Sequence, residues 1–392
     1  MDYHRLTRNC LYILTAHDEM QKSADVAYPF FQDTNFYYAT RLAEPGWLAV
    51  INTHTMDHAL LAPKRDVTKE LFDGMLTYDE VRSRTAIATI IPYEERADFL
   101  RQLSTTYTTV HTLGRDPHAP YYSHTQNPAQ ARLTRQLNKL FKTVVDCRPE
   151  FARLRALKTA DECVLMQRAV DTTTQAFQEL KKALPTSHYE YELEALLNAT
   201  FRRTGAQGHA YDPIVASGAH ACTLHYTANA TQLPRHGLVL IDAGSQVNGY
   251  AADVTRTYAI GTPTPRQIEV HAAVEKAHHA IIALIKPGVA LKSYSESVDE
   301  IMKTALQEVG LLEDRKDSQT YQRYFPHAIS HGLGLDVHES LGGYKEFMPG
   351  MVFTVEPGIY IPEEGIGVRI EDDILVTETG HENLSAALPT GL

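Results

Sequence analysis

Four acidic residues stand inside apolar segments of this chain, and they restrict its fold more than any other feature of the sequence. They are Asp242 and Asp253 in GLVLIDAGSQVNGYAADVTRTYAI, Glu356 in MVFTVEPGIYI and Glu371 in IGVRIEDDILV. Such segments belong in the interior of a protein, where a carboxylate without a partner is strongly unfavourable. The chain must therefore bring these acids together around a compensating charge, and a metal ion would supply it.

Three histidines occur within twelve positions of the segment HAISHGLGLDVHE (327–339), and glycines stand among them. They are His327, His331 and His338. Glycines between potential ligands suggest a place where a ligand approaches the backbone closely. Taken alone, such histidines are as often structural as functional. Beside four acids in apolar segments, they favour the floor of a metal site.

The register of a predicted hairpin directs two of the acids toward one place. Asn248 and Gly249 form a strong tight-turn pair between two apolar runs. A turn centred there places Asp242 opposite Thr255 and makes Asp253 its diagonal neighbour, at roughly 7 to 8 Å between backbones.

The last predicted strand has a polar face and an apolar face. Side chains alternate between the two faces of a strand, so Arg369, Glu371 and Asp373 share one face and Ile370 points to the other. Glu371 therefore points away from the apolar side. We expect the neighbouring Asp372, like Asp373, to face solvent or to support the ligands from behind them.

Four carboxylates and one imidazole exceed what a single catalytic zinc ion takes, which is usually three protein ligands. They suit two divalent ions about 3.5 to 4 Å apart. Oxygen ligands favour Mn(II), and one histidine also admits Co(II), Fe(II) or Zn(II). Because such ions activate water for attack, the pattern predicts a hydrolase.

The length of 392 residues favours two domains. Residues 1–155 combine predicted strands at 45–53, 58–63 and 84–93 with a helix at 94–103, which is typical of a separate α/β domain. From Thr159 a capped helical pattern begins, and residues 156–392 follow the order helix, helix, strands twice. We expect an α/β (α+β) fold with a pseudo-twofold second domain. Its helices are predicted at 159–184, 188–205, 266–288 and 293–310.

The bulk composition excludes several classes of protein. A net charge of -11 argues against binding of nucleic acid. No apolar run reaches the roughly 18 residues of a membrane-spanning helix, so no membrane association is expected. The cysteines are scattered singly and no signal-peptide pattern begins the chain, which predicts a cytoplasmic protein with reduced thiols. These cysteines are Cys10, Cys147, Cys163 and Cys222.

Five motifs in order resemble the pita-bread metallopeptidases, specifically the Xaa-Pro aminopeptidases (aminopeptidase P). They are HYTAN, IDAGSQVNGYAADVTRT, HAISHGLGLDVHE, TVEPGIYI and GVRIEDD. The segment SADVAYPFFQDTNFYYAT (23–40) is similar to the opening of that family's N-terminal domain. The resemblance covers nearly the whole chain. It departs from the family at Ala328, where glycine is usual, and at Phe72, where some relatives carry tryptophan.

The resemblance implies a role for each matching residue. Five would be metal ligands, with two of them bridging the ions: Asp242, Asp253 (bridging), His331, Glu356 and Glu371 (bridging). Glu356 would also transfer protons. His225, His327 and His338 would contact substrate, and Arg369 would support a bridging acid. Asp25 matches an acid that approaches the site from a neighbouring subunit in these aminopeptidases, which implies a homo-oligomer, a dimer or a tetramer.

Three functions fit these residues. The favoured one is removal of the N-terminal residue from proline-containing peptides with proline in second position. The second is an Xaa-Pro dipeptidase (prolidase), whose metal motifs are nearly the same and whose substrate cleft closes differently. The third is a pita-bread module that binds peptides without catalysis, against which the retention of all five ligands argues. Methionine aminopeptidase shares the ligands, but the long N-terminal domain argues against it.

Overall fold

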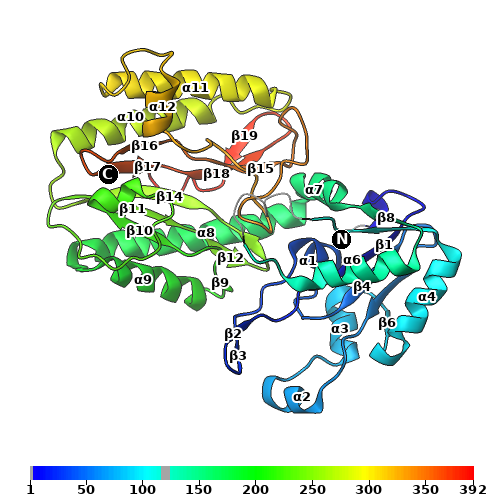
Figure 1. Ribbon diagram of the computed structural model, residues 1–392. Coiled ribbons are helices and arrows are strands. Elements are labelled where there is room, and N and C mark those ends of the chain that lie inside the picture. The colour runs from blue at the N-terminus through cyan, green and yellow to red at the C-terminus, as the bar shows by residue number, and fades with distance from the viewer. Residues whose placement is uncertain (1–2, 116–123) are drawn as a thin grey trace. The chain divides into compact units, whose positions relative to one another are not determined.

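The computed structural model describes residues 3–115 and 124–392, which form two compact units (Figure 1). The first unit ends at Phe151 and the second begins at Ala152, within helix α7 (Arg148–Ala156). The predicted boundary near residue 155 falls at the end of the same helix. Helices and strands occur in both units, so the predicted mixed α/β class is confirmed.

The first unit is built on a six-stranded sheet in the order β6-β5-β4-β1-β7-β8. The central strands β1 and β4 are fully buried because helices cover the sheet. The strands of this sheet are β1 (Leu11–Thr15), β4 (Leu48–Asn52), β5 (His58–Leu61), β6 (Thr89–Ile91), β7 (Thr109–Thr112) and β8 (Thr143–Asp146). The helices are α1 (Thr34–Thr40), α2 (Val67–Asp73), α3 (Tyr78–Thr85), α4 (Arg96–Thr106) and α6 (Pro128–Leu140).

Two predicted strands of this unit are confirmed as β4 and β5, and the third was predicted too long. Residues 84 and 85 belong to helix α3, which begins with a capping box between Thr77 and Glu80, so only Thr89–Ile91 pair as a strand. A small exposed hairpin, β2 (Gln21–Ser23) and β3 (Val26–Ala27), carries Asp25 in its turn.

The second unit contains the four predicted long helices. Helix α8 begins with the predicted capping box, in which the Thr159 amide donates to the Glu162 carboxylate at 2.8 Å. A shorter helix, α12, precedes the histidine segment. The helices are α8 (Ala160–Ala183), α9 (Glu190–Arg203), α10 (Pro265–Ile282), α11 (Leu291–Glu308) and α12 (Ser318–Tyr324).

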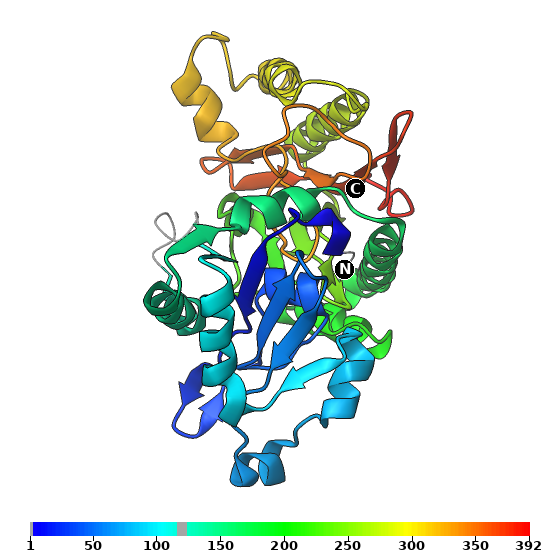
Figure 2. The ribbon, with the colours of Figure 1, turned by 90° about the vertical axis from the view of Figure 1, so that its right-hand side faces the viewer.

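The strands of the second unit lie between two helix pairs. Figure 1 shows α8 and α9 on one side of them and α10 and α11 on the other, and Figure 2 shows α10 and α11 nearly end on, side by side. The chain thus follows the order helix, helix, strands twice, as predicted. The strands are β9 (Gly208–His209), β10 (Ile214–Ser217), β11 (Gly237–Ala243), β12 (Ser245–Val247), β13 (Tyr250–Ala251), β14 (Val254–Ile260), β15 (Val352–Val355), β16 (Gly358–Ile361), β17 (Ile366–Arg369), β18 (Asp372–Val376) and β19 (His381–Asn383).

The acidic hairpin has the predicted register but is interrupted. Asp242 pairs with Thr255, and the turn residues Asn248 and Gly249 have φ values of 49° and 82°. The ladder breaks at Gly244, where a Cβ atom would lie 1.6 Å from a backbone oxygen of the opposite strand. Strands β12 and β13 therefore leave the sheet of β11 and β14 and form a separate sheet, in which β12 pairs with both β13 and β9. The break releases Asp253 from the ladder just before β14.

The core of the second unit lies between the helix pair α10 and α11 and the strands β15 to β18. Its apolar side chains come from both helices at helical spacing and from the strands, so the helices and strands of the second repeat share one interior. Within residues 3–115 and 124–392, no helix is both long enough and apolar enough to cross a membrane.

Candidate metal centre

The acids that the sequence places in apolar segments meet at one point of the second unit. A ligating atom from each of Asp253, His331 and Glu371 lies within 4.8 Å of the other two. The His331 Nε2 atom is 3.5 Å from a carboxylate oxygen of Asp253 and 3.5 Å from one of Glu356. Asp242 joins them through the Tyr211 hydroxyl, which lies 2.5 Å from an oxygen of Asp242 and 2.5 Å from one of Asp253.

Backbone pairing between distant strands fixes these ligands. Thr255 in β14 accepts a hydrogen bond from the Glu371 amide at 3.0 Å, and its hydroxyl donates to the Glu371 carboxylate at 2.6 Å. These bonds join the strands of the first helix–helix–strand repeat to those of the second. Glu371 is therefore held beside Asp253 although 118 positions separate them in the sequence.

The histidine segment runs along the neighbouring strand β15. The Thr354 amide donates to the His331 carbonyl at 3.0 Å, and the Glu356 amide donates to the Ile329 carbonyl at 3.0 Å. Glu356 follows the last residue of β15, so its carboxylate turns out of the strand toward His331. The predicted strand-end position of this acid is thus observed.

The four carboxylates carry more negative charge than their surroundings balance. Arg369 is the cation placed against them, and its guanidinium donates to Asp242 at 2.5 Å. Burial, followed by repulsion from neighbouring carboxylates, raises the pKa values of Asp253 and Glu371 well above their usual range. Burial also raises the pKa of Glu356 to about 8. Two divalent cations would balance this excess, so the donor set fits a dinuclear centre.

The central imidazole has the protonation state that a metal ligand needs. Burial lowers the pKa of His331 to about 4, so the ring is neutral near pH 7. Its Nδ1 atom lies 3.1 Å from the Gly332 carbonyl oxygen, which leaves the lone pair on Nε2 facing the carboxylates. A neutral imidazole beside oxygen donors suits Mn(II), Co(II), Fe(II) or Zn(II).

Two of the other predicted histidines, His327 and His338, lie beside this cluster. His327 Nε2 lies 2.8 Å from the Tyr360 hydroxyl, and its Nδ1 lies 3.6 Å from a Glu356 oxygen. The ring of His338 is exposed, with its centroid 4.4 Å from that of His331. His225 is exposed. Burial lowers the pKa of His327 to about 4, so this ring is neutral near pH 7. Asp25 lies in the first unit, on the exposed β2–β3 hairpin.

Sequence reasoning missed two tyrosines of the site. Tyr211, in the segment GHAYDP, joins two of the acids, and Tyr360 connects His327 to Arg369, whose guanidinium donates to its hydroxyl at 2.8 Å. Neither tyrosine stands in a pattern that singles it out. The alternative that Asp372 and Asp373 face solvent was wrong. Asp372 accepts from Arg256 at 2.6 Å, Asp373 accepts from the Asp253 amide at 3.1 Å, and both are buried.

Models of known protein families match both units of this chain. The model of Metallopeptidase family M24 matches residues 164–378, and that of Aminopeptidase P, N-terminal domain, matches residues 3–111. The Xaa-Pro aminopeptidase of Escherichia coli (strain K12) is 34% identical over 96% of this chain and 90% of its own. Mouse Xaa-Pro aminopeptidase 3 is 33% identical over 94% of this chain and 76% of its own.

Solved structures give the same result. Aminopeptidase P from E. coli with the inhibitor Pro-Leu superposes with a TM-score of 0.86 and 31% identity, covering 99% of this chain and 93% of that one. Proline aminopeptidase P II from Yersinia pestis superposes with a TM-score of 0.84 and 32% identity, covering 99% and 94%.

Proposed function

Because the chain belongs to metallopeptidase family M24 and matches Xaa-Pro aminopeptidases over nearly its whole length, we propose that it is a metal-dependent Xaa-Pro aminopeptidase. It removes the N-terminal residue from peptides whose second residue is proline. The observation that carries this function is the cluster of four carboxylates, three of them buried, around one neutral imidazole. Residues 156–392 form the catalytic domain in this proposal, and residues 1–155 form the aminopeptidase-P-like domain.

Five residues hold two divalent ions, most simply two Mn(II) ions, because four of the five ligands supply oxygen. The ligands are Asp242, Asp253, His331, Glu356 and Glu371. Asp253 and Glu371 would be the bridging ligands, because a ligating atom of each lies within 4.8 Å of the other and of His331. When bound, such ions polarise a carbonyl group and lower the pKa of water toward about 7.

Side chains around the ligands keep them in place and position the peptide. Arg369 holds Asp242 through its guanidinium and contacts the Tyr360 hydroxyl, which in turn contacts His327. This chain of contacts fixes the His327 ring beside Glu356. His225 and His338 are the exposed donors that hydrogen-bond the substrate or the oxyanion that develops at its carbonyl.

Proton transfer falls to Glu356. The nitrogen of the scissile bond is the proline nitrogen, which carries no hydrogen in the peptide and must gain a proton before it departs. Glu356 lies at the end of β15 with one oxygen 3.3 Å from the Thr354 hydroxyl and the other 3.6 Å from His327. Its carboxylate is thus oriented at the edge of the cluster, where it can take up a proton and return it to the leaving nitrogen.

The cysteines, the exposed hairpin and the net charge bear on the compartment, the oligomeric state and the partners of the enzyme. Single, unpaired cysteines fit a reducing compartment, for which we propose the cytoplasm. A homo-oligomer, a dimer or a tetramer, would allow Asp25 on the exposed hairpin of one subunit to reach the site of another. The negative net charge makes peptides, and not nucleic acids, the expected partners.

The test is cleavage of a matched pair of peptides, Ala-Pro and Ala-Pro-Ala, by protein stripped of metal and reloaded with Mn(II). Metal-dependent release of alanine from the tripeptide is the expected result. Cleavage of the dipeptide alone would indicate a dipeptidase. If no divalent metal supports cleavage of either peptide, the proposed function is wrong and a peptide-binding role takes its place.

A further inference from the structure

The exposed His225 lies in a loop of residues 217–231, which we call the His225 loop. The loop begins at the last residue of β10, passes through the short 3-10 helix η4 (Gly218–Cys222) and returns to the start of α9. There the Glu190 amide donates to the Thr231 carbonyl at 3.0 Å. The part that carries His225 has no helix or strand of its own, so side-chain contacts must fix its position.

The first part of the His225 loop packs against β17. A Cβ atom on Gly367 would lie 2.3 Å from the carbonyl oxygen of Ala221, so only glycine allows the two backbones to approach this closely. The Cys222 Sγ atom lies 3.3 Å from the Ile366 carbonyl oxygen. Strand β17 ends at Arg369, the residue that contacts the ligand Asp242.

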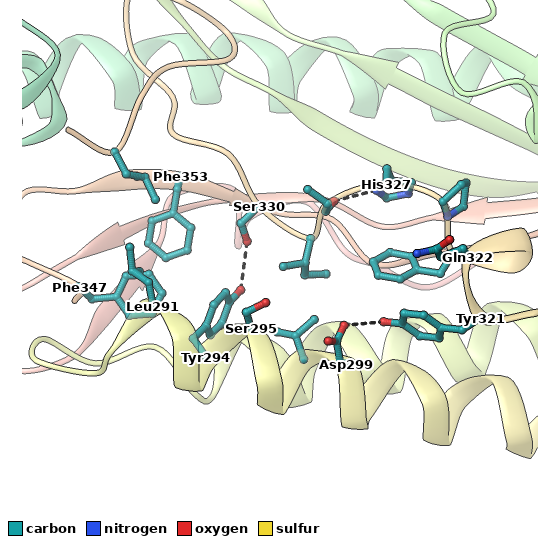
Figure 3. Close-up of a pocket in the computed structure, with 16 residues that line it drawn as sticks. Leu291, Tyr294, Ser295, Asp299, Tyr321, Gln322, His327, Ser330, Phe347 and Phe353 are labelled. Atoms are coloured by element: carbon teal, nitrogen blue, oxygen red, sulfur yellow. Dashed lines mark hydrogen bonds between the residues drawn. The ribbon is translucent and has the colours of Figure 1, made fainter. Parts of the chain in front are cut away.

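The residues next to His225 also pack beside the metal centre. Leu224 and Tyr226 contact an apolar cluster that contains Tyr360. The Tyr360 hydroxyl lies 2.8 Å from Nε2 of His327, whose ring also lines a cavity of about 670 Å³ beside α11 and α12 (Figure 3). A ring that borders a cavity lacks packing contacts on that side, so the contact with Tyr360 helps to fix it. The His225 loop therefore supports the surroundings of the site and carries His225 there.

A single buried carboxylate, that of Glu190, holds both ends of the loop. Glu190 is the first residue of α9 and is fully buried. One of its oxygens accepts from the Ser217 amide at 2.9 Å and from the Ser217 hydroxyl at 2.7 Å. The other accepts from the Tyr226 hydroxyl at 2.9 Å and from the Thr231 amide at 2.9 Å. These donors come from the two ends of the loop and from the residue that follows His225.

The hydrogen bonding favours a carboxylate at position 190. A carboxylate is an acceptor only, with about four lone-pair sites on its two oxygens, and the four donors of the loop match them. Glutamine has one acceptor oxygen and would direct an N–H group at the Thr231 amide, which is itself a donor. The start of a helix also favours a negative charge. His220 adds a further contact, because its Nδ1 atom lies 3.7 Å from the Glu190 carboxylate and its ring stacks on Tyr226.

We propose that Glu190 is a positioning residue, whose carboxylate holds the His225 loop so that the His225 ring reaches the substrate. This proposal rests on the proposed function, because contact between His225 and the substrate is part of it. The bonds of Glu190 go to the loop, whereas the metal ligands are held by the pairing of β14 and β15 with their neighbours. Loss of the carboxylate should therefore impair turnover and leave metal binding intact.

The test is Glu190→Gln, with Glu192→Gln as the matched control. Glu192 lies in the same first turn of α9 and accepts from the His188 amide at 2.7 Å. Amide hydrogen exchange over residues 218–231 of the full chain, with and without Mn(II), reports the order of the loop. Calorimetric titration gives the Mn(II) affinity. Kinetics for Ala-Pro-Ala with Mn(II) are measured for each substitution in the wild type and in His225→Ala.

Glu190→Gln should speed exchange in the loop by about tenfold or more, with and without Mn(II). It should lower kcat/KM by about 10- to 100-fold, because a displaced contact residue has this effect, with the Mn(II) affinity within about twofold of the wild type. In His225→Ala the same substitution should lower kcat/KM by less than about threefold, because both changes remove one contribution. Glu192→Gln should leave all three measurements within about twofold.

Unchanged exchange in Glu190→Gln, or equal losses of kcat/KM with and without His225, would overturn this role while the wild type is active. An inactive wild type with every divalent metal would refute the proposed function and this role with it. Should Glu190→Gln fail to fold, Tyr226→Phe replaces it, since it removes one donor and keeps the carboxylate. Its loss of about fivefold should likewise disappear in His225→Ala, and an equal loss in both backgrounds would overturn the proposal.

Discussion

The Lys158 ammonium lies 2.6 Å from the Glu339 carboxylate, and both side chains are buried. Arg155 contacts the other oxygen of the same carboxylate at 2.9 Å. The Glu339 amide donates to the Gly332 carbonyl at 2.7 Å and so closes the loop of residues 332–339. His331 directly precedes this loop, and His338 lies within it. This ion cluster therefore anchors the loop that follows a metal ligand and carries a substrate-contacting residue.

Glu339→Gln should strongly destabilise the second unit. The amide keeps the shape of the side chain but leaves Lys158 buried without its negative partner, and breaking a buried pair in this way costs about 3 to 5 kcal/mol. Urea unfolding of the metal-free protein measures the change. Asp336→Asn is the matched control, because Asp336 also contacts Arg155 but its side chain is 42% exposed, and its loss should cost about 1 kcal/mol or less. Equal effects of the two substitutions would contradict this account.

Replacement of an assigned bridging ligand should separate activity from folding. Asp253→Ala or Glu371→Ala should lower kcat by about a thousandfold or more and reduce the bound metal below two ions per chain. The metal-free variants should be no less stable than the metal-free wild type, because each removes one carboxylate from a buried, mutually repelling group. Metal analysis, kinetics and thermal unfolding test the three parts. Near wild-type turnover in either metal-loaded variant would remove that residue from the ligand set.

The sequence predicts most of the fold because its local signals agree with the tertiary structure. The capping box at Thr159 fixes the start of α8, and the turn at Asn248 and Gly249 fixes the pairing of Asp242 with Thr255. Each of these two sequence patterns lies within a few residues of the helix start or strand pairing that it determines. The interruption at Gly244 was not predicted, since it depends on the close approach of the opposite strand.

The site is predictable where acids stand in apolar segments, because burial of a charge is itself the signal. Tyr211 and Tyr360 carry no such signal, because a tyrosine in a loop or strand is equally expected in an ordinary core. Asp372 could not be placed from alternation alone. The strand ends at Arg369 and restarts at Asp372, and both faces of the new strand are covered.

Tyr211→Phe should weaken metal binding while preserving the fold. Burial and the nearby carboxylates hold the pKa of Tyr211 far above its usual range, so its hydroxyl stays a donor between Asp242 and Asp253. Loss of such a supporting contact typically lowers metal affinity by about 10- to 100-fold. Calorimetric titration of the metal-free protein with Mn(II) measures the affinity. Tyr191→Phe, at an exposed position, is the control, and an unchanged affinity in Tyr211→Phe would show that the contact does not orient the ligands.

Burial of His278 should lower the free energy of unfolding at acidic pH relative to neutral pH. Its ring is buried, and burial lowers its pKa to about 4 although Asp372 lies 3.3 Å away, because Arg256 already neutralises that carboxylate. The unfolded chain binds the proton near pH 6.5 and the folded chain does not, so the stability that this group contributes above pH 6.5 is lost as the pH falls toward 4.

Because of His278, the free energy of unfolding at pH 4 should be about 3 kcal/mol lower than at neutral pH. His278→Gln should flatten the fall in urea midpoint between pH 6.5 and 4, whereas the exposed neighbour His279→Gln should leave the slope unchanged. Identical slopes for wild type and His278→Gln would show that the ring is protonated in the folded state.

His338→Ala should lower turnover without removing metal. The ring stacks edge-on against His331 and is exposed, so it stands beside the ligands and faces incoming peptide. Loss of a donor to a developing oxyanion typically costs about 10²- to 10³-fold in kcat. The expected result is such a fall for Ala-Pro-Ala, with the metal content within error of the wild type. His188→Ala, exposed in the same unit, is the control. A fall in bound metal that parallels the fall in kcat would instead make His338 a ligand, and the assignment of His331 as the single imidazole of the centre would have to change.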